Sequence, residues 1–199
     1  MHRFGPWFGG GRWLIPIASA ALAILVAVGG DDGRLLLRYQ RSAIEQGEFW
    51  RLLTGHFTHI GWSHLTMNLL ALAGIWALVG QNLRARQWLF VYAVTVAGID
   101  AGFWWCDPRL TWYVGLSGVL HGLLLAGLGA GWRTRPAEAV VLAALLVAKL
   151  AYEQRYGALP GSAETAGDGV VVNAHLYGAL AGSLGLLLLR IRVSADASI

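Results

Sequence analysis

One stretch of this 199-residue chain places a serine and a histidine inside an otherwise apolar run. Residues 115–122 read GLSGVLHG. A polar side chain in such a segment is costly in a membrane and usually marks function. On a helix, Ser117 and His121 lie one turn apart on the same face, while Gly118 and Gly122 would let a second helix approach closely. The stretch therefore predicts a buried serine that a neighbouring base could activate as a nucleophile.

The composition is typical of a membrane protein. Apolar residues make up 56% of the chain and charged residues 13%, against about 45–50% and about 25% in soluble domains. The single cysteine, Cys106, excludes an intramolecular disulfide and a cysteine-rich metal site. The net charge of +4 comes with arginines scattered in pairs between apolar runs, so we expect no nucleic-acid partner.

The hydropathy pattern predicts an all-α polytopic membrane protein with six transmembrane helices. The six apolar runs cover residues 13–29, 61–80, 88–105, 113–132, 137–152 and 170–189. A signal peptide is the alternative for the first run, but five more apolar runs follow it. Residues 31–59 mix charged and apolar side chains, which is typical of an amphipathic outer loop in the membrane interface. We expect a core over 13–191, flanked by a short leader (1–12) and a tail (192–199).

Loop charges predict the orientation of the bundle. Eight arginines lie on one side of the six runs: Arg3, Arg12, Arg84, Arg86, Arg133, Arg135, Arg190 and Arg192. Three basic residues lie in the short loops of the other side: Arg109, Lys149 and Arg155. The positive-inside rule therefore places both termini in the cytoplasm (N-in/C-in), with the long first loop outside.

In this orientation three spans carry polar residues near their outer ends. These residues are His64, Asn68, Ser117, His121, Asn173 and His175. Because unpaired polar groups are costly in lipid, we expect them to converge in one protein-lined or watered pocket.

Two histidines compete as the base for Ser117. His175 is favoured because Gly178 and Gly182 on its span can mesh with Gly118 and Gly122, whereas His121 is the rival because it leans toward Ser117. No aspartate is well placed as a third member, so a dyad is expected. Donors for an oxyanion are available from the free amides at the start of the serine helix and from the side chains of His64 and Asn68.

Taken together, the motifs resemble those of the rhomboid intramembrane serine proteases. The resemblance rests on four segments: Gly115-Leu-Ser117-Gly118, His59 and His64 followed by Asn68, Glu48-Phe-Trp50-Arg51, and Ala174-His175-Leu-Tyr-Gly178. It implies a six-helix rhomboid-like bundle with Ser117 as nucleophile, His175 as general base, and His64, Asn68 and the Ser117 amide as oxyanion hole. It also implies that Glu48, Trp50 and Arg51 brace the outer loop, and that neither a cofactor nor a metal is needed.

The residue four positions after the serine departs from this pattern. Bacterial rhomboids commonly have a tyrosine there, stacked on the base, whereas this chain has His121. The histidine and the compact chain resemble the rhombosortase branch, whose members remove C-terminal Gly-Gly sorting tails from exported proteins. That resemblance implies transmembrane or C-terminally anchored substrates, in the bilayer of a bacterial inner membrane, with the active site toward the periplasmic half.

Three alternatives stay open at this point. The chain could be a generic rhomboid protease acting on other transmembrane substrates. It could be a metal- or haem-binding membrane protein that uses His56, His59, His64, His121 and His175, although no HExxH motif and no pocket carboxylate supports that reading. It could also be an inactive rhomboid-like binding protein, although such proteins usually lose the serine or the histidine.

Overall fold

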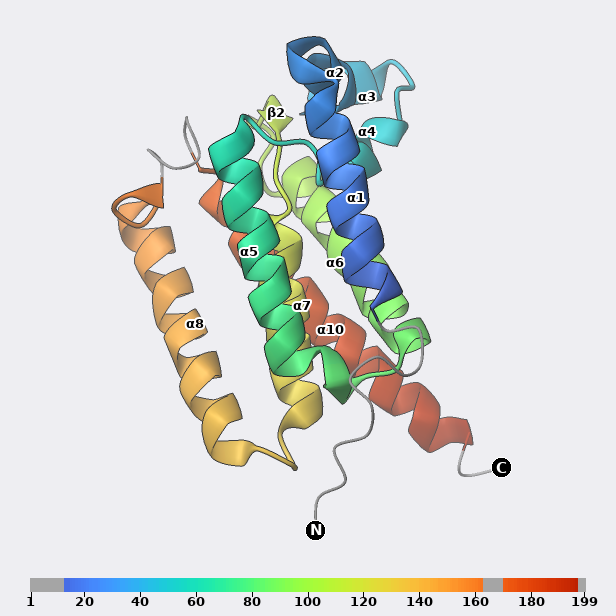
Figure 1. Ribbon diagram of the computed structural model, residues 1–199, viewed down its shortest axis with the longest axis vertical. Helices are drawn as coiled ribbons and strands as arrows, with labels where there is room; N and C mark the ends of the chain where they lie inside the picture. Colours follow the sequence, from blue (N-terminus) through green and yellow to red (C-terminus); the bar gives the residue numbers. More distant parts are fainter. Residues whose placement is uncertain (1–12, 163–169, 197–199) are drawn as a thin grey trace.

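The computed structural model describes residues 13–162 and 170–196, with backbone alone over 192–196. The predicted leader, 1–12, lies outside these residues. The main helices are α1 (Leu14–Val28), α5 (Trp62–Val79), α6 (Ala85–Trp105), α7 (Ser117–Gly131), α8 (Pro136–Tyr156) and α10 (Val172–Asp196). The helical prediction is confirmed, since each of the six apolar runs lies largely on one of these helices. α7 packs against α5, α6, α8 and α10, which surround it (Figure 1).

Short elements gather at one end of the bundle, around the start of α7 (Figure 1). They are α2 (Gly30–Leu37), β1 (Tyr39–Gln40), α3 (Arg41–Glu45), α4 (Trp50–Thr54) and β2 (Trp112–Tyr113). β1 pairs antiparallel with β2, with Tyr39 opposite Tyr113. The start of α1 and the end of α10 lie at the opposite end, as does the 3₁₀ turn Gly80–Asn82 that follows α5 (Figure 1).

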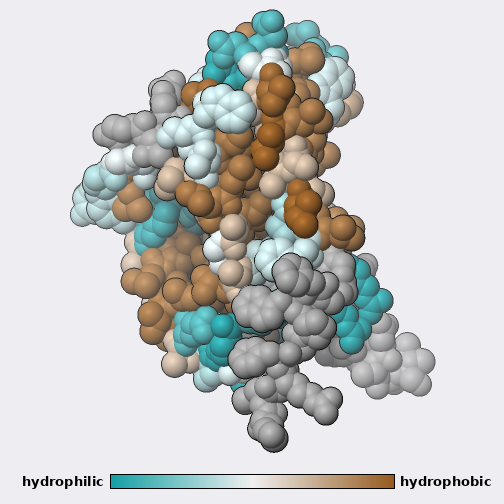
Figure 2. All heavy atoms as spheres, viewed as in Figure 1, coloured by the Kyte–Doolittle hydropathy of each residue, from teal (hydrophilic) through white to brown (hydrophobic). Residues whose placement is uncertain are grey.

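Within the part of the chain that the structure describes, three segments are long and apolar enough to cross a membrane: Trp62–Asn82, Ala85–Trp105 and Val172–Ile191. The pair α1 and α2 also qualifies, but the chain bends by 119° between them, and α7 is a shorter apolar helix of 15 residues. Apolar side chains cover the middle of the face in Figure 2, and hydrophilic ones gather toward its ends. The chain is therefore a multi-pass membrane protein, whereas six spans and the N-in/C-in orientation stay predictions.

Glycines bring α7 and α10 into backbone contact. A methyl group added at Gly118 would lie 2.8 Å from the Ala174 carbonyl oxygen, and one at Gly122 would lie 2.5 Å from that of Gly178. A methyl group at Gly178 or Gly182 would collide with the backbone of Gly118 or Gly122. Only glycine permits this approach, which sets the first turn of α7 against the first turns of α10.

Arg41, the first residue of α3, connects the short elements at this end of the bundle to the segment that leads into α7. Its backbone N–H donates to the Thr111 carbonyl at 2.9 Å, and the Gly115 N–H donates to the Gly55 carbonyl at 3.1 Å. The Arg41 guanidinium donates to three carbonyl oxygens in and after the last turn of α6: Phe103, Asp107 and Leu110. Because the last carbonyls of a helix have no partner within it, Arg41 both caps α6 and fixes the loop before Ser117.

Arg51 connects α4 to α2. Its side chain is 8% exposed and donates to Glu48 Oε2 at 2.6 Å and to the carbonyl oxygens of Leu35 and Arg38 at 2.9 and 3.0 Å. Trp50 lies on the outside of the same helix and is 48% exposed. This arrangement is compatible with the bracing that the resemblance implies for the three residues.

Candidate active site

A cavity of about 590 Å³ lies between α5, α7, α8 and α10. Five of the predicted site residues line it: His64, Asn68, Ser117, His121 and His175. Two residues of α8, Lys149 and Glu153, line it as well. The cavity is thus the place where the chemically capable side chains meet.

Ser117 and His175 are in direct contact. Ser117 is the first residue of α7, so its backbone N–H belongs to the helix turn that has no internal partner. Its hydroxyl lies 2.9 Å from His175 Nε2, and His175 is only 5% exposed. A hydroxyl held against an imidazole nitrogen in this way can transfer its proton when it attacks an electrophile.

Glu153 is a site residue that the sequence analysis missed. Its carboxylate is buried, and Oε2 accepts a hydrogen bond from His175 Nδ1 at 2.9 Å. The expectation that no carboxylate accompanies the histidine is therefore wrong. The fifth apolar run was expected to end at 152, whereas α8 continues to Tyr156 and carries Glu153 into the cavity wall.

Lys149 lies one helical turn before Glu153 and had been assigned to an outer loop. Its ammonium is 2.7 Å from Glu153 Oε1 and 3.4 Å from His175 Nδ1. The carboxylate is therefore held between a lysine on its own helix and the histidine of α10. The i, i+4 spacing of Lys149 and Glu153 was the sequence signal for this pair.

His121 stacks on His175. Their ring centroids are 4.2 Å apart and the planes differ by 14°. His121 Nδ1 lies 2.7 Å from the backbone carbonyl oxygen of Ser117 and so donates to it. His121, the rival base, thus contacts the backbone carbonyl of Ser117, whereas the Ser117 hydroxyl contacts His175.

The other side of the serine is formed by α5 and by the turn before α7. Gly115 has φ +128°, which favours glycine, and a methyl group there would lie 3.0 Å from the His64 ring. Asn68 Nδ2 donates to the His64 carbonyl at 3.0 Å, which leaves its second hydrogen for a ligand. His64 and Asn68 therefore lie on the cavity wall as side-chain donors beside Ser117.

His59 supports His64 from the loop before α5. The two rings meet edge to face with centroids 4.9 Å apart, and His59 Nδ1 donates to the Phe57 carbonyl at 3.1 Å. Burial, together with the charge of a protonated His64, lowers the pKa of His59 from 6.5 to about 3. His59 is therefore neutral at physiological pH and acts as a packing and hydrogen-bonding residue.

Asn173 does not join the cluster, contrary to the expectation that all six polar residues converge. Its side-chain amide lies 2.9 Å from both carboxylate oxygens of Asp107, and the Tyr177 hydroxyl donates to the same carboxylate at 3.0 Å. These bonds fasten the start of α10 to the loop after α6. Asn173 and Asp107 thus help to fix the helix that carries His175.

The cluster also has the composition of a metal site, since His121, Glu153 and His175 offer ligand atoms within 4.8 Å of one another. The two rings are stacked nearly parallel, so their lone pairs do not converge on one point as zinc ligands must. Glu153 also has a cation beside it in Lys149. The donor geometry fits a hydrogen-bonded serine site better than a metal site.

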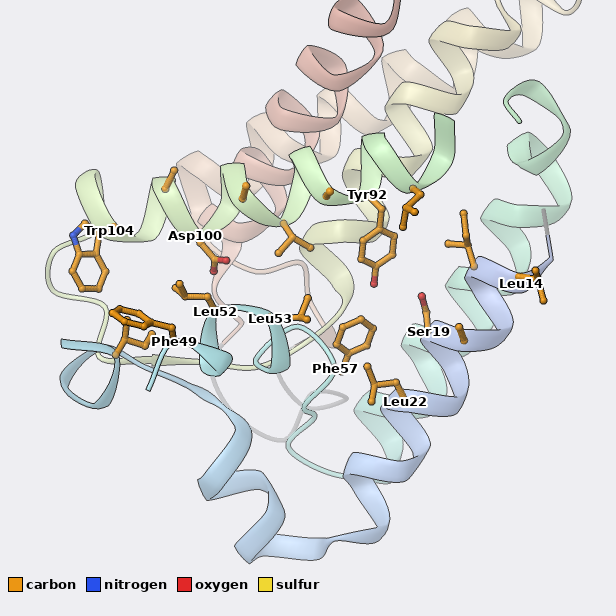
Figure 3. Close-up of a pocket in the computed structure, with 18 of the residues that line it drawn as sticks. Leu14, Ser19, Leu22, Phe49, Leu52, Leu53, Phe57, Tyr92, Asp100 and Trp104 are labelled. Carbon is orange, nitrogen blue, oxygen red and sulfur yellow. The ribbon is translucent and has the colours of Figure 1, made fainter. Parts of the chain in front are cut away.

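A second cavity, of about 960 Å³, is lined by α1, α4, α6 and the residues around them. Its lining is largely apolar, and the hydroxyls of Ser19 and Tyr92 point toward one another across it (Figure 3). Asp100 lies on its wall, and one oxygen of its carboxylate is 3.3 Å from His56 Nε2. Among the described residues that line it there is one serine and no histidine, so this cavity shows no serine–histidine pair.

Fold and site together define a helical membrane protein with a serine at a helix start, hydrogen-bonded to a buried histidine of a neighbouring helix. Residues 46–192 match the Rhomboid domain family, and the chain belongs to that family. It is also similar to the Rhomboid protease GluP of Bacillus subtilis (strain 168), with 37% identity over 86 residues. The similar stretch covers 43% of this chain and 16% of that protein, so the chain matches only a small part of its relative's length.

Proposed function

We propose that this protein is an intramembrane serine endopeptidase in which Ser117 is the nucleophile and His175 the general base. The observation that carries the proposal is the 2.9 Å contact between Ser117 Oγ and His175 Nε2 at the start of α7. Membership of the Rhomboid domain family and the similarity to a rhomboid protease support it independently.

The chemistry follows from the hydrogen bonds. Because the Glu153 carboxylate can only accept, His175 Nδ1 carries the hydrogen and Nε2 is free to take the proton of Ser117. The oxygen of Ser117 attacks the substrate carbonyl, and an acyl-enzyme forms when His175 returns the proton to the leaving amine. Water then hydrolyses the acyl-enzyme. His64, Asn68 and the Ser117 amide would stabilise the oxyanion, for which one donor is worth roughly 3–4 kcal/mol.

The substrate would be a protein segment anchored in the membrane. Met67 and Ala71 of α5 and Leu146 of α8 line the same cavity as Ser117, so a segment entering between these helices would reach the serine. The rhombosortase-like histidine at 121 favours C-terminal Gly-Gly tails as the substrate class. Glycines near the cleaved bond would help the segment leave the helical conformation.

The proposed setting is a bacterial inner membrane, spanned six times with both termini in the cytoplasm. The loop charges support it, and so does the fold, because α1 begins and α10 ends at the same end of the bundle. The start of α7 lies at the other end, which would place the cavity in the periplasmic half, where water can reach it.

Cleavage of a reporter tests the proposal. The purified protein would be reconstituted with a reporter that carries a Gly-Gly motif, a hydrophobic segment and a basic end, and with a second reporter whose glycines are replaced by leucine. We expect Ser117→Ala and His175→Ala to abolish cleavage. Ser183→Ala is the matched control, because that hydroxyl donates to the Ala179 carbonyl on the far part of α10.

The two reporters separate the activity from the substrate class. Equal cleavage of both reporters would support a rhomboid protease with broader substrates and contradict the Gly-Gly preference. Cleavage that persists in Ser117→Ala would contradict the proposed nucleophile.

A further inference from the structure

The carboxylate of Glu153 bridges a cation and the proposed base. Oε1 is 2.7 Å from Lys149 Nζ, and Oε2 is 2.9 Å from His175 Nδ1. Lys149 and His175 are 3.4 Å apart, yet His175 Nδ1 has one hydrogen and the ammonium has only donors. The carboxylate is therefore the shared acceptor that holds these two donors together.

Burial of the Glu153 carboxylate costs free energy unless a neighbouring cation compensates its charge. The Glu153 side chain is 1% exposed, and a lone carboxylate in such a position would be strongly disfavoured. The Lys149 ammonium compensates the charge of this carboxylate. The Lys149 side chain is 27% exposed, so it is less buried than Glu153. Lys149 and Glu153 together leave the resting site neutral.

We propose that Glu153 is a positioning residue that turns the expected dyad into a Ser117–His175–Glu153 triad, with Lys149 as the cation that holds Glu153 ionised and aimed. Glu153 fixes the His175 tautomer with hydrogen on Nδ1 and stabilises the imidazolium that forms during attack. This inference rests on the proposed function of Ser117 and His175.

The path of each proton during the reaction is consistent with this role of Glu153. The Ser117 hydroxyl proton moves to His175 Nε2 as the Oγ–carbon bond forms, while the Nδ1 hydrogen stays on His175. Glu153 accepts a hydrogen bond throughout and takes no proton. When the acyl-enzyme forms, the Nε2 proton leaves with the amine. The oxyanion and the imidazolium appear together, so the site stays neutral overall when Lys149 balances Glu153.

Other titratable groups also face His175. His121 stacks on it from α7, His64 lines the same cavity from α5, and Lys149 and Glu153 approach from α8. Any pH profile belongs to this set and not to one residue. A comparison of variants at single positions therefore carries more information than one midpoint.

The test measures the rate at which a fluorophosphonate labels Ser117, as a function of pH, in wild type and four variants. Glu153→Gln should slow labelling by about 10²- to 10⁴-fold, because the amide no longer enforces the tautomer, and should move the half-maximal rate to lower pH. Glu153→Asp should recover part of that loss. Lys149→Met should slow labelling by about tenfold and move the midpoint to higher pH, since an unbalanced carboxylate then faces the imidazole.

Glu138→Gln is the matched control, because Glu138 lies on α8 but pairs with Arg135 at the other end of the helix. The opposite midpoint shifts of Glu153→Gln and Lys149→Met are the signature of the triad, since a merely structural pair would shift neither. A labelling rate in Glu153→Gln within threefold of the control, at an unchanged midpoint, would overturn the inference even if Ser117 is reactive. If wild-type Ser117 does not label at all, the proposed function fails and the triad fails with it. Should Glu153→Gln not fold, the labelling rate of Glu153→Asp and the midpoint of Lys149→Met decide the question, and values equal to those of Glu138→Gln would overturn the inference.

Discussion

The imidazole of His121 lies flat against that of His175 and is tied to the backbone of Ser117. This hydrogen bond fixes the orientation of the His121 ring against His175. Under the proposed function, His121 would support the base and His175 would transfer the proton. A stacked ring can hold the base in place through its face alone. We therefore assign His121 to orientation and His175 to proton transfer.

Replacing His121 tests that assignment. We expect His121→Phe to keep the Ser117 labelling rate within about tenfold of wild type, because phenylalanine can still stack, whereas His175→Ala should reduce the rate by about 10³-fold or more. The measurement is the same fluorophosphonate labelling at neutral pH. The reverse pattern would make His121 the base.

His59 makes the fold sensitive to acid. Its pKa lies near 3 in the folded protein against 6.5 when exposed, so above about pH 6.5 both states hold it neutral. As the pH falls below 6.5, His59 binds a proton in the unfolded chain but stays neutral in the folded protein. This one residue should then lower the free energy of unfolding by up to roughly 1.4 kcal/mol per pH unit until the pH approaches 3.

His59→Asn removes the titration and can keep the donor to the Phe57 carbonyl. We expect its thermal unfolding midpoint in detergent to fall less steeply than that of wild type between pH 7 and pH 4.5. Identical slopes for the two proteins would show that His59 is not the acid-sensitive group.

Residue types alone located most of the site but not all of it. Ser117, His175, His64 and Asn68 could be found because each is a polar residue within an apolar run. Glu153 was missed because the predicted fifth run ends at residue 152, which assigns Glu153 to the loop that follows. Asn173 was misplaced because position along a span does not determine which neighbour a side chain faces, and Asp107 lies close enough to bind it.

At the scale of elements, the contact of α7 with α10 brings the serine and the histidine together. Glycines at 118, 122, 178 and 182 permit it, and in a membrane such close packing replaces the hydrophobic effect as the source of helix association. An added methyl group at this crossing would separate the two first turns.

Gly178→Ala should therefore damage both stability and activity. A methyl group there collides with the backbone carbonyl of Gly118, so we expect a loss of roughly 1–3 kcal/mol in the free energy of unfolding and slower labelling of Ser117. Gly74→Ala on α5 is the control, since nothing lies within 4 Å of its added methyl group. The helix propensity of alanine should make that variant neutral or slightly more stable. Equal behaviour of the two variants would contradict the packing role.

The helices were predictable because each is a long apolar segment with its own local signal. The pairing of β1 with β2 was not, because Tyr39 and Tyr113 are far apart in sequence and each strand is two residues long. Arg41 was visible only as a charge of an interfacial loop, and the bracing role of Arg51 came only from the family resemblance. The carbonyl groups that these two side chains bind belong to other elements and leave no local signal in the sequence.

At the scale of the whole molecule, the site lies at one end of a helical bundle that belongs to the Rhomboid domain family. The short helix α7 begins beneath the short helices and strands at this end of the bundle, so its first turn lines the cavity and does not face the lipid. Charged Lys149 and Glu153 of α8 also line this cavity. The candidate site therefore includes residues of two described helices, α7 and α8, that do not meet the length and composition of a membrane span.

The most direct measurement of the central claim is fluorophosphonate labelling of the full chain in membranes, followed by mass spectrometric mapping of the modified residue. We expect labelling at Ser117 alone, lost in Ser117→Ala and strongly reduced in His175→Ala. Labelling that persists in Ser117→Ala, or repeated absence of label in folded wild-type protein, would contradict it.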